Sequence, residues 1–114
     1  MAKDDYFVIV YQILAYLYQR LKKGEPVQEY MLQCGSPLFA SINRNYWAYI
    51  IYTLSDGGYI DGIIFVELDG LNIPYAASLE NCYITPSGIA YLCDNFFIEK
   101  AKNFLKDINE IIPF

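Results

Sequence analysis

The sequence predicts a single, mainly helical α+β domain, and its size, composition and apolar periodicity each support this prediction. Its 114 residues fall within the usual size of one domain, and a chain of this length buries roughly two thirds of its unfolded surface. Hydrophobic residues make up 55% of the chain, which excludes a disordered protein. Apolar residues recur at helical spacing in the first half, and the pattern changes to that of strands from residue 59. We therefore expect one domain over residues 1–114, with its core in about residues 5–95.

The first helix is expected at Tyr6–Lys23. Asp4 or Asp5 can cap its start, and Gly24 follows the cations of its last turn, where a left-handed residue commonly ends a helix. Its apolar residues form two adjacent stripes, so we expect this helix to be covered on more than one side. One stripe consists of Phe7, Val10, Leu14, Leu17 and Leu21, and the other of Tyr6, Ile9, Ile13 and Tyr16.

Two further helices are expected before residue 58. Pro26 suits the first turn of a short amphipathic helix that Gly35 ends. Ser41 or Asn43 can cap a third helix, which runs to about Ser55 and is stopped by Asp56 and two glycines. The strongest apolar face of this third helix consists of Trp47, Ile50, Ile51 and Leu54, and three tyrosines lie off that face, namely Tyr46, Tyr49 and Tyr52.

A two-stranded hairpin is expected after the third helix. Tyr59–Val66 predicts a strand with a bend at Asp61 and Gly62, and Asn81–Thr85 predicts its antiparallel partner. Glu67–Glu80, between these two strands, predicts a long loop.

Two C-terminal helices complete the predicted order. Thr85 and Pro86 are typical of a helix start, and this fourth helix should extend to about Asp94. The last helix is expected at residues 96–112, and we interpret it as a packing or dimerisation helix. Its apolar residues alternate four and three apart, as in a coiled coil, but over only two heptads: Phe97, Ala101, Phe104, Ile108 and Ile111.

Three helices, a two-stranded hairpin and C-terminal helices follow one another in the order of a winged helix-turn-helix. Two stretches sharpen this prediction. Trp47–Ile60 ends in the pattern leucine-x-x-x-glycine-tyrosine, like a third winged helix leading into its first strand, and Ile84–Leu92 looks like the exit from the wing. Both stretches resemble the YjcQ family of small phage and prophage proteins from Gram-positive bacteria, and the resemblance covers most of the chain from Tyr6 onward.

The resemblance implies a winged-helix fold and a phage or prophage origin, and it supplies no catalytic residues. The segment Gly35–Ile42 departs from ordinary DNA-binding winged helices, because they usually connect the second and third helices with about three or four residues.

Charge is distributed unevenly along the chain, which carries 13 acidic and 8 basic residues and a net charge of −5. Residues 24–99 contain nine acidic residues and one basic residue, Arg44. This acidic centre disfavours DNA as a partner, because phosphate contacts require Lys or Arg side chains. Basic residues gather at 20–23 and 100–106, and we interpret them as helix-end cations and a solvated helix face. A basic patch, formed if the two clusters lie together, is the alternative.

Catalysis is disfavoured by the residue content. The chain has no His, which removes Ser-His-Asp and Cys-His nucleophile activation and most zinc sites. The carboxylates of Asp56, Asp61, Glu67 and Asp69 flank turns, so we expect solvated turn residues rather than a catalytic pair. We therefore expect no catalytic, metal or cofactor site.

Cysteine spacing and apolar run length indicate the cellular setting. Cys34, Cys82 and Cys93 lack the C-x-x-C spacing of a metal site, and we expect three buried free thiols in a reducing cytoplasm. The apolar run Tyr6–Tyr18 is too short to span a bilayer, so we expect no membrane partner.

Twelve tyrosines provide more amphipathic aromatic surface than one small core easily hides. We expect an interaction face at Arg44, Tyr46, Tyr49 and Tyr52, and a homodimer face formed by Ile9, Ile13, Tyr16, Phe97, Phe104 and Ile108. A tyrosine-rich core with hydroxyl groups at its edge is the alternative. The sequence thus favours a non-enzymatic, regulatory module acting through a protein partner or itself, and a winged-helix DNA-binding transcriptional regulator is the rival hypothesis.

Overall fold

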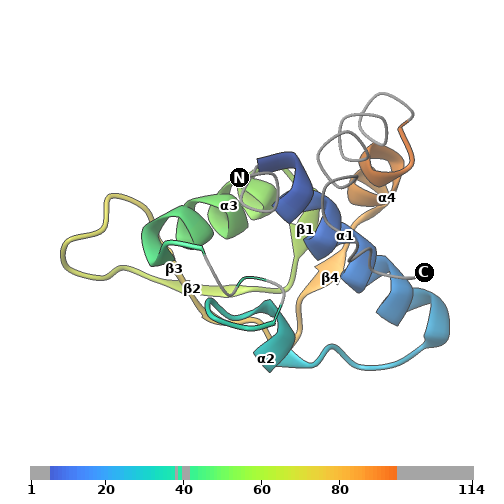
Figure 1. Cartoon of the computed structure of the whole chain (residues 1–114), viewed down its shortest axis with the longest axis horizontal. Coiled ribbons are helices and arrows are strands. Elements are labelled where there is room, and N and C mark those ends of the chain that lie inside the picture. The colour runs from blue at the N-terminus through green and yellow to red at the C-terminus, as the bar shows by residue number, and fades with distance from the viewer. Residues whose placement is uncertain (1–5, 38, 40–41, 95–114) are drawn as a thin grey trace.

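The computed structural model describes residues 6–37, 39 and 42–94 and confirms an α+β domain (Figure 1). The four helices of this part of the chain are α1 (Tyr6–Lys23), α2 (Glu29–Leu32), α3 (Arg44–Asp56) and α4 (Pro86–Leu92). Its four strands are β1 (Ile60–Asp61), β2 (Ile64–Val66), β3 (Tyr75–Ser78) and β4 (Tyr83–Ile84). The predicted last helix at 96–112 lies outside the described residues.

Helix α1 is the centre of the core, and its predicted bounds are confirmed. It packs against β4 and α4, and the core cluster also brings α3 against it (Figure 1). Its buried residues come from both apolar stripes, as expected for a helix covered on more than one side: Val8, Ile9, Val10, Ile13, Leu14, Ala15, Tyr16 and Leu17.

Helix α3 starts and stops where the sequence predicts. The Asn43 side chain accepts hydrogen bonds from the backbone N–H groups of Asn45 and Tyr46, at 2.8 and 3.4 Å, and so caps the first turn. At the other end Gly58 has a φ of +82°, a left-handed conformation that glycine adopts without strain. The buried face consists of Trp47, Ala48, Ile50, Ile51 and Leu54.

Helix α2 is shorter than predicted, because it begins three residues after Pro26 and ends at Leu32. The backbone N–H of Gln28 donates to the Tyr16 hydroxyl at 2.9 Å, which holds the segment before α2 in an extended conformation. The carbonyl groups of Met31 and Leu32 accept from the Ser36 hydroxyl and the Trp47 indole N–H, both at 2.9 Å. These two bonds, one local and one from α3, satisfy carbonyl groups at the helix end, so α2 stops early.

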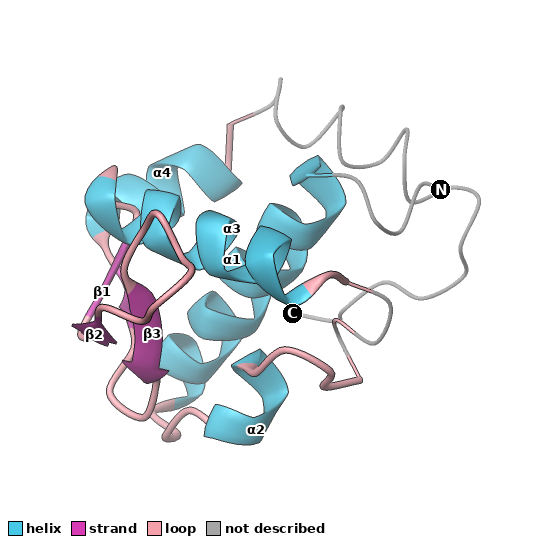
Figure 2. Ribbon diagram, turned by 90° about the vertical axis from the view of Figure 1, so that its left-hand side faces the viewer, coloured by secondary structure: helices cyan, strands magenta, loops and turns pink. Residues whose placement is uncertain are grey.

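The predicted hairpin is divided into two small sheets, and the prediction of a long loop over residues 67–80 is wrong in part. Figure 2 shows β3 beside β2. Gly62, with a φ of +84°, separates β1 from β2. β1 pairs with β4 in antiparallel register, with Ile60 opposite Ile84. β2 pairs with β3, which the sequence analysis missed because alanine is uncommon in strands and two alanines occupy its centre.

Helix α4 closes the domain as predicted. The Thr85 hydroxyl accepts from the Gly88 N–H at 3.1 Å, and Pro86 occupies the first helical position. Gly88 is buried, and a Cβ atom there would collide with the backbone carbonyl of Tyr59. Only glycine therefore allows α4 to lie this close to the start of β1.

We expect the Gly88→Ala variant to lose about 1–3 kcal/mol of unfolding free energy, because the new methyl group forces α4 away from Tyr59. The measurement is the midpoint of urea unfolding. The matched control is Ser87→Ala at the exposed neighbouring position, which should change stability by less than about 0.5 kcal/mol. Equal midpoints for the two variants would contradict the close approach.

Candidate interaction surfaces

The predicted interaction face on α3 is not one surface. Arg44 points toward β3: its guanidinium carbon lies 4.8 Å from the centre of the Tyr75 ring, and its Nε donates to the Tyr75 hydroxyl at 3.3 Å. Tyr52 packs edge to face on Phe65 of β2, with ring centres 5.7 Å apart. Tyr49 is half exposed. The structure thus brings Arg44 and Tyr52 against the strands and leaves Tyr49 open to solvent.

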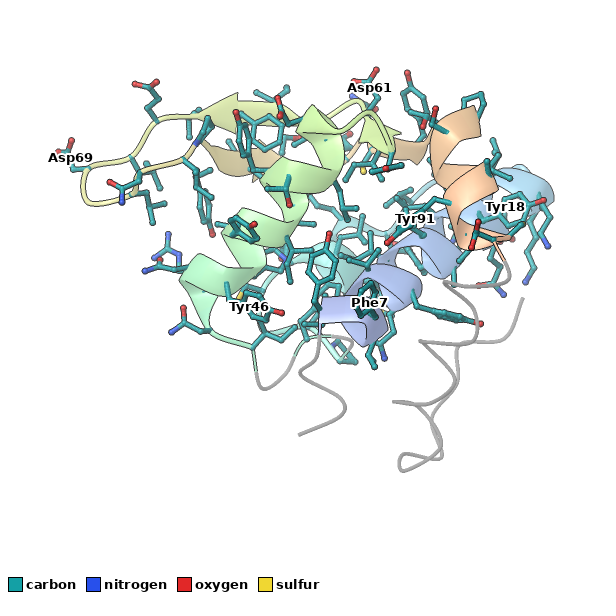
Figure 3. The ribbon with its side chains drawn as sticks, turned by 90° about the horizontal axis from the view of Figure 1, so that it is seen from above. Phe7, Tyr18, Tyr46, Asp61, Asp69 and Tyr91 are labelled. Atoms are coloured by element: carbon teal, nitrogen blue, oxygen red, sulfur yellow. The ribbon has the colours of Figure 1, made fainter. Side chains whose placement is uncertain are left out.

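Tyr46 belongs to a separate aromatic cluster at the start of α1 (Figure 3). Burial raises the pKa of Tyr6, and the neighbouring phenols of Tyr49, Tyr59 and Tyr46 raise it further. Tyr59 stacks on Tyr91 of α4 with ring centres 5.0 Å apart. The four tyrosines of this cluster are partly buried against the core, as the alternative of a tyrosine-rich core with hydroxyl groups at its edge predicts. They are Tyr6, Tyr46, Tyr59 and Tyr91.

The predicted dimer face does not lie on the surface. Ile9, Ile13 and Tyr16 are at most 4% exposed and belong to the core of the folded chain. The prediction of these three as dimer contacts is wrong, because helical periodicity identifies an apolar face but not the element that covers it. Its other residues, Phe97, Phe104 and Ile108, lie outside the described residues. Whether the protein forms a dimer stays a prediction.

After Arg44 at its first position, the solvent face of α3 contains no further basic side chain. Asn45, Tyr49, Tyr52 and Asp56 recur at helical spacing and are exposed or partly exposed. Arg44 precedes them at the helix start, with its side chain held on Tyr75. This face therefore combines aromatic, polar and acidic groups.

The hairpin of β2 and β3, with its connecting loop, carries an apolar surface that the sequence analysis missed. Ile64, Val66 and Leu68 occupy alternate positions and are 58%, 40% and 38% exposed, and we name them the hairpin stripe. Phe65, between them, points inward to Tyr52. Residues 63–66 are all apolar, so alternation could not identify the exposed face.

Exposed carboxylates lie next to the hairpin stripe in the sequence. Glu67 lies between Val66 and Leu68 in the sequence, and Asp69 lies at the outer tip of the loop that joins β2 and β3 (Figure 3). Asp61 and Asp56 are also exposed, as expected for solvated turn residues. Asp61 accepts a hydrogen bond from the Tyr83 hydroxyl at 3.3 Å, and its charge raises the pKa of that hydroxyl. From Val66 to Asp69, exposed apolar side chains therefore alternate with exposed carboxylates.

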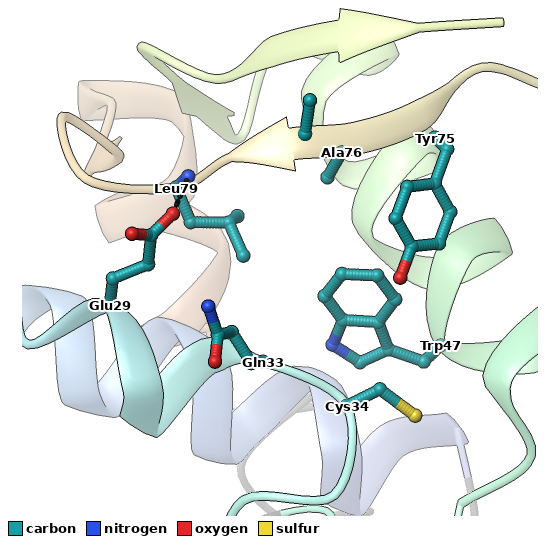
Figure 4. Close-up of a pocket in the computed structure, with 8 residues that line it drawn as sticks. Glu29, Gln33, Cys34, Trp47, Tyr75, Ala76 and Leu79 are labelled. Carbon is teal, nitrogen blue, oxygen red and sulfur yellow. Dashed lines mark hydrogen bonds between the residues drawn. The ribbon is translucent and has the colours of Figure 1, made fainter.

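A pocket of about 260 Å³ lies between α2, α3 and β3 (Figure 4). Glu29 lines this pocket and connects α2 to the residue after β3, because its carboxylate accepts a hydrogen bond from the Leu79 N–H at 2.7 Å. Within the described residues, no group of three or more His, Cys, Asp or Glu side chains is placed to hold a metal ion. The lining residues are Glu29, Gln33, Cys34, Trp47, Tyr75, Ala76, Ala77 and Leu79.

The three cysteines differ in exposure, so the prediction of three buried thiols is wrong in part. Cys82 is buried in the turn before β4, whereas Cys34 is partly buried and Cys93 is exposed. Burial, together with the negative charge of Asp61, raises the pKa of the Cys82 thiol to about 12.

The model of a protein family described as "YjcQ protein" matches residues 11–111 of the chain. Neither the curated proteins nor the solved structures contain a match. In the described part of the chain, no helix is long and apolar enough to cross a membrane.

We expect Cys93 to be alkylated by iodoacetamide at pH 8 at least about 100 times faster than Cys82, because alkylation requires an accessible thiolate. With a pKa of about 12, Cys82 is a thiolate in only about one molecule in ten thousand at this pH. Mass mapping of labelled peptides measures both rates. Labelling in urea is the control, in which the two rates should converge, and equal rates in the native protein would contradict the burial of Cys82.

Proposed function

The chain belongs to the YjcQ family, and we propose that it is a non-enzymatic, regulatory winged-helix module of phage or prophage type that acts through protein contacts. The proposal includes a bacterial cytoplasmic location, where free thiols stay reduced.

The order of the elements supports a winged helix. β1 follows α3 directly, its antiparallel partner β4 immediately precedes α4, and β2 and β3 extend the strands between them. In winged helices of this order, α3 and the strand hairpin form the surface that approaches a partner. The fold alone does not identify the function, because one fold serves many activities, and the residues on that surface decide what it can bind.

The hairpin stripe is the observation that carries the proposal. It exposes three apolar side chains side by side, and the solvent face of α3 adds the half-exposed Tyr49. Apolar and aromatic groups of this kind form the centres of protein interfaces, where their removal from water stabilises the complex. The same surface offers phosphate groups almost no positive charge, and Glu67 and Asp69 would repel them.

DNA binding is the second candidate function. The exposed start of α3 presents Arg44 and Asn45, which are side-chain types that read base edges in the major groove. These two residues supply one cation, whereas tight DNA binding draws on several. A duplex titration separates the two candidates.

We expect no saturable binding of a mixed-sequence duplex up to about 20 µM protein at about 50 mM salt, measured by fluorescence anisotropy. Glu67→Lys with Asp69→Lys should gain salt-dependent binding, because the border of the hairpin would then attract phosphates. The control, Glu80→Lys with Asp94→Lys, changes the net charge equally at exposed positions outside α3 and the hairpin and should gain much less. Wild-type binding that falls steeply with salt and disappears in Arg44→Ala would establish the DNA-binding function instead.

A further inference from the structure

Two chemically opposite surfaces lie at opposite ends of the molecule. The loop that joins β2 and β3 forms one end of the longest axis, and the last turn of α1 lies at the other end (Figure 1). A second view shows the same separation, with Asp69 at one side and Tyr18 at the other (Figure 3). The hairpin stripe and its carboxylates belong to the first end.

The second end, here named the basic end, consists of Arg20, Leu21, Lys22 and Lys23. Leu21 is 51% exposed among the three cations. Aromatic rings hold two of these cations: the Arg20 guanidinium carbon lies 5.3 Å from the centre of the Tyr16 ring, and the Lys22 ammonium lies 4.5 Å from that of Tyr18. Glu25 neutralises part of this charge through an ion pair with Arg20 at 3.1 Å. Counted over the described residues, the basic end therefore remains positive around an apolar centre.

The two ends match each other in chemistry. One presents exposed apolar side chains with exposed carboxylates next to them in the sequence, and the other presents an exposed apolar side chain with basic neighbours. We propose that the basic end of a second copy of this chain docks on the hairpin stripe, head to tail. Leu21 would contact the stripe, and Lys22 and Lys23 would face Glu67 and Asp69. The inference rests on the proposed function, since it names the partner of the same surface.

Charge selects this arrangement over a symmetric one. Two hairpin stripes placed face to face would bring Glu67 and Asp69 of both copies together, and like charges at an interface oppose binding. Head-to-tail docking pairs opposite charges instead. Because each copy in such a pair keeps one unused stripe and one unused basic end, association can continue into a chain or close into a ring.

Sedimentation velocity over about 5–500 µM protein at about 50 mM salt tests the proposal. The expected result is a mean mass that rises with concentration and falls when salt is added, because salt weakens charge pairing. Two charge-reversed variants locate the contact. The stripe variant is Glu67→Lys with Asp69→Lys, and the end variant is Lys22→Glu with Lys23→Glu; each alone should associate at least about tenfold more weakly than the wild type.

Mixing the two variants in equal amounts should restore association. The reversed hairpin of the stripe variant then meets the reversed end of the end variant, and the two unaltered surfaces still match. Variants of the apolar residues complement this test. Val66→Ser with Leu68→Ser should also weaken association about tenfold. The control is Tyr30→Ser, which changes an exposed aromatic residue outside both surfaces and should leave association unchanged. Urea unfolding confirms that each variant is folded.

Three results would overturn the proposal: a wild type that stays monomeric over the whole range, a mixture that does not restore association, or variants that associate as strongly as the wild type. Each is distinct from failure of the proposed function. If the protein is monomeric and does not bind DNA, head-to-tail docking is excluded but the proposed function through protein contacts stands with a different partner. Saturable DNA binding would instead exclude the proposed function itself.

Discussion

The Trp47 indole links three parts of the chain that are distant in sequence. Its N–H donates to the Leu32 carbonyl at 2.9 Å, which ends α2, and its ring packs against Tyr75 of β3 with centres 5.5 Å apart. The indole is 2% exposed, so its polar N–H needs a partner inside the protein. Because Tyr75 in turn contacts the Arg44 side chain, this buried ring connects the hairpin to α3 and to the only cation of residues 24–94.

The position of the hairpin determines which of its faces meets water. Phe65 must pack on Tyr52 once β3 is held by Trp47, and strand alternation then directs Ile64 and Val66 outward. Three neighbouring exposed apolar side chains on a small protein favour association, either with a specific partner or by aggregation. The surface chemistry of the hairpin is thus a consequence of core packing.

Local signals in the sequence located the elements better than their surfaces. Asn43, Thr85 and the glycines after α3 predicted helix ends correctly, because a cap acts through its own neighbouring backbone. The early end of α2 depends on Trp47, 15 residues away in sequence, and no local pattern reveals such a bond. The same limit explains the candidate sites: Ile9 and Ile13 form the same apolar pattern in the sequence whether a second copy or the rest of the same chain covers them.

The carboxylates beside the hairpin stripe act on several interactions at once. Charges next to an exposed apolar strand oppose indiscriminate pairing of strands, a common protection for edges in β proteins. Glu67 and Asp69 also repel phosphate groups and a second hairpin of the same kind. A partner with an apolar centre and cations around it is attracted by these carboxylates, whereas unrelated strands, phosphate groups and a second hairpin are disfavoured. The two carboxylates thus contribute specificity by excluding other partners as well as by attracting one. Within the part of the chain that the structure describes, the end of α1 has this chemistry, because its cations surround an exposed leucine.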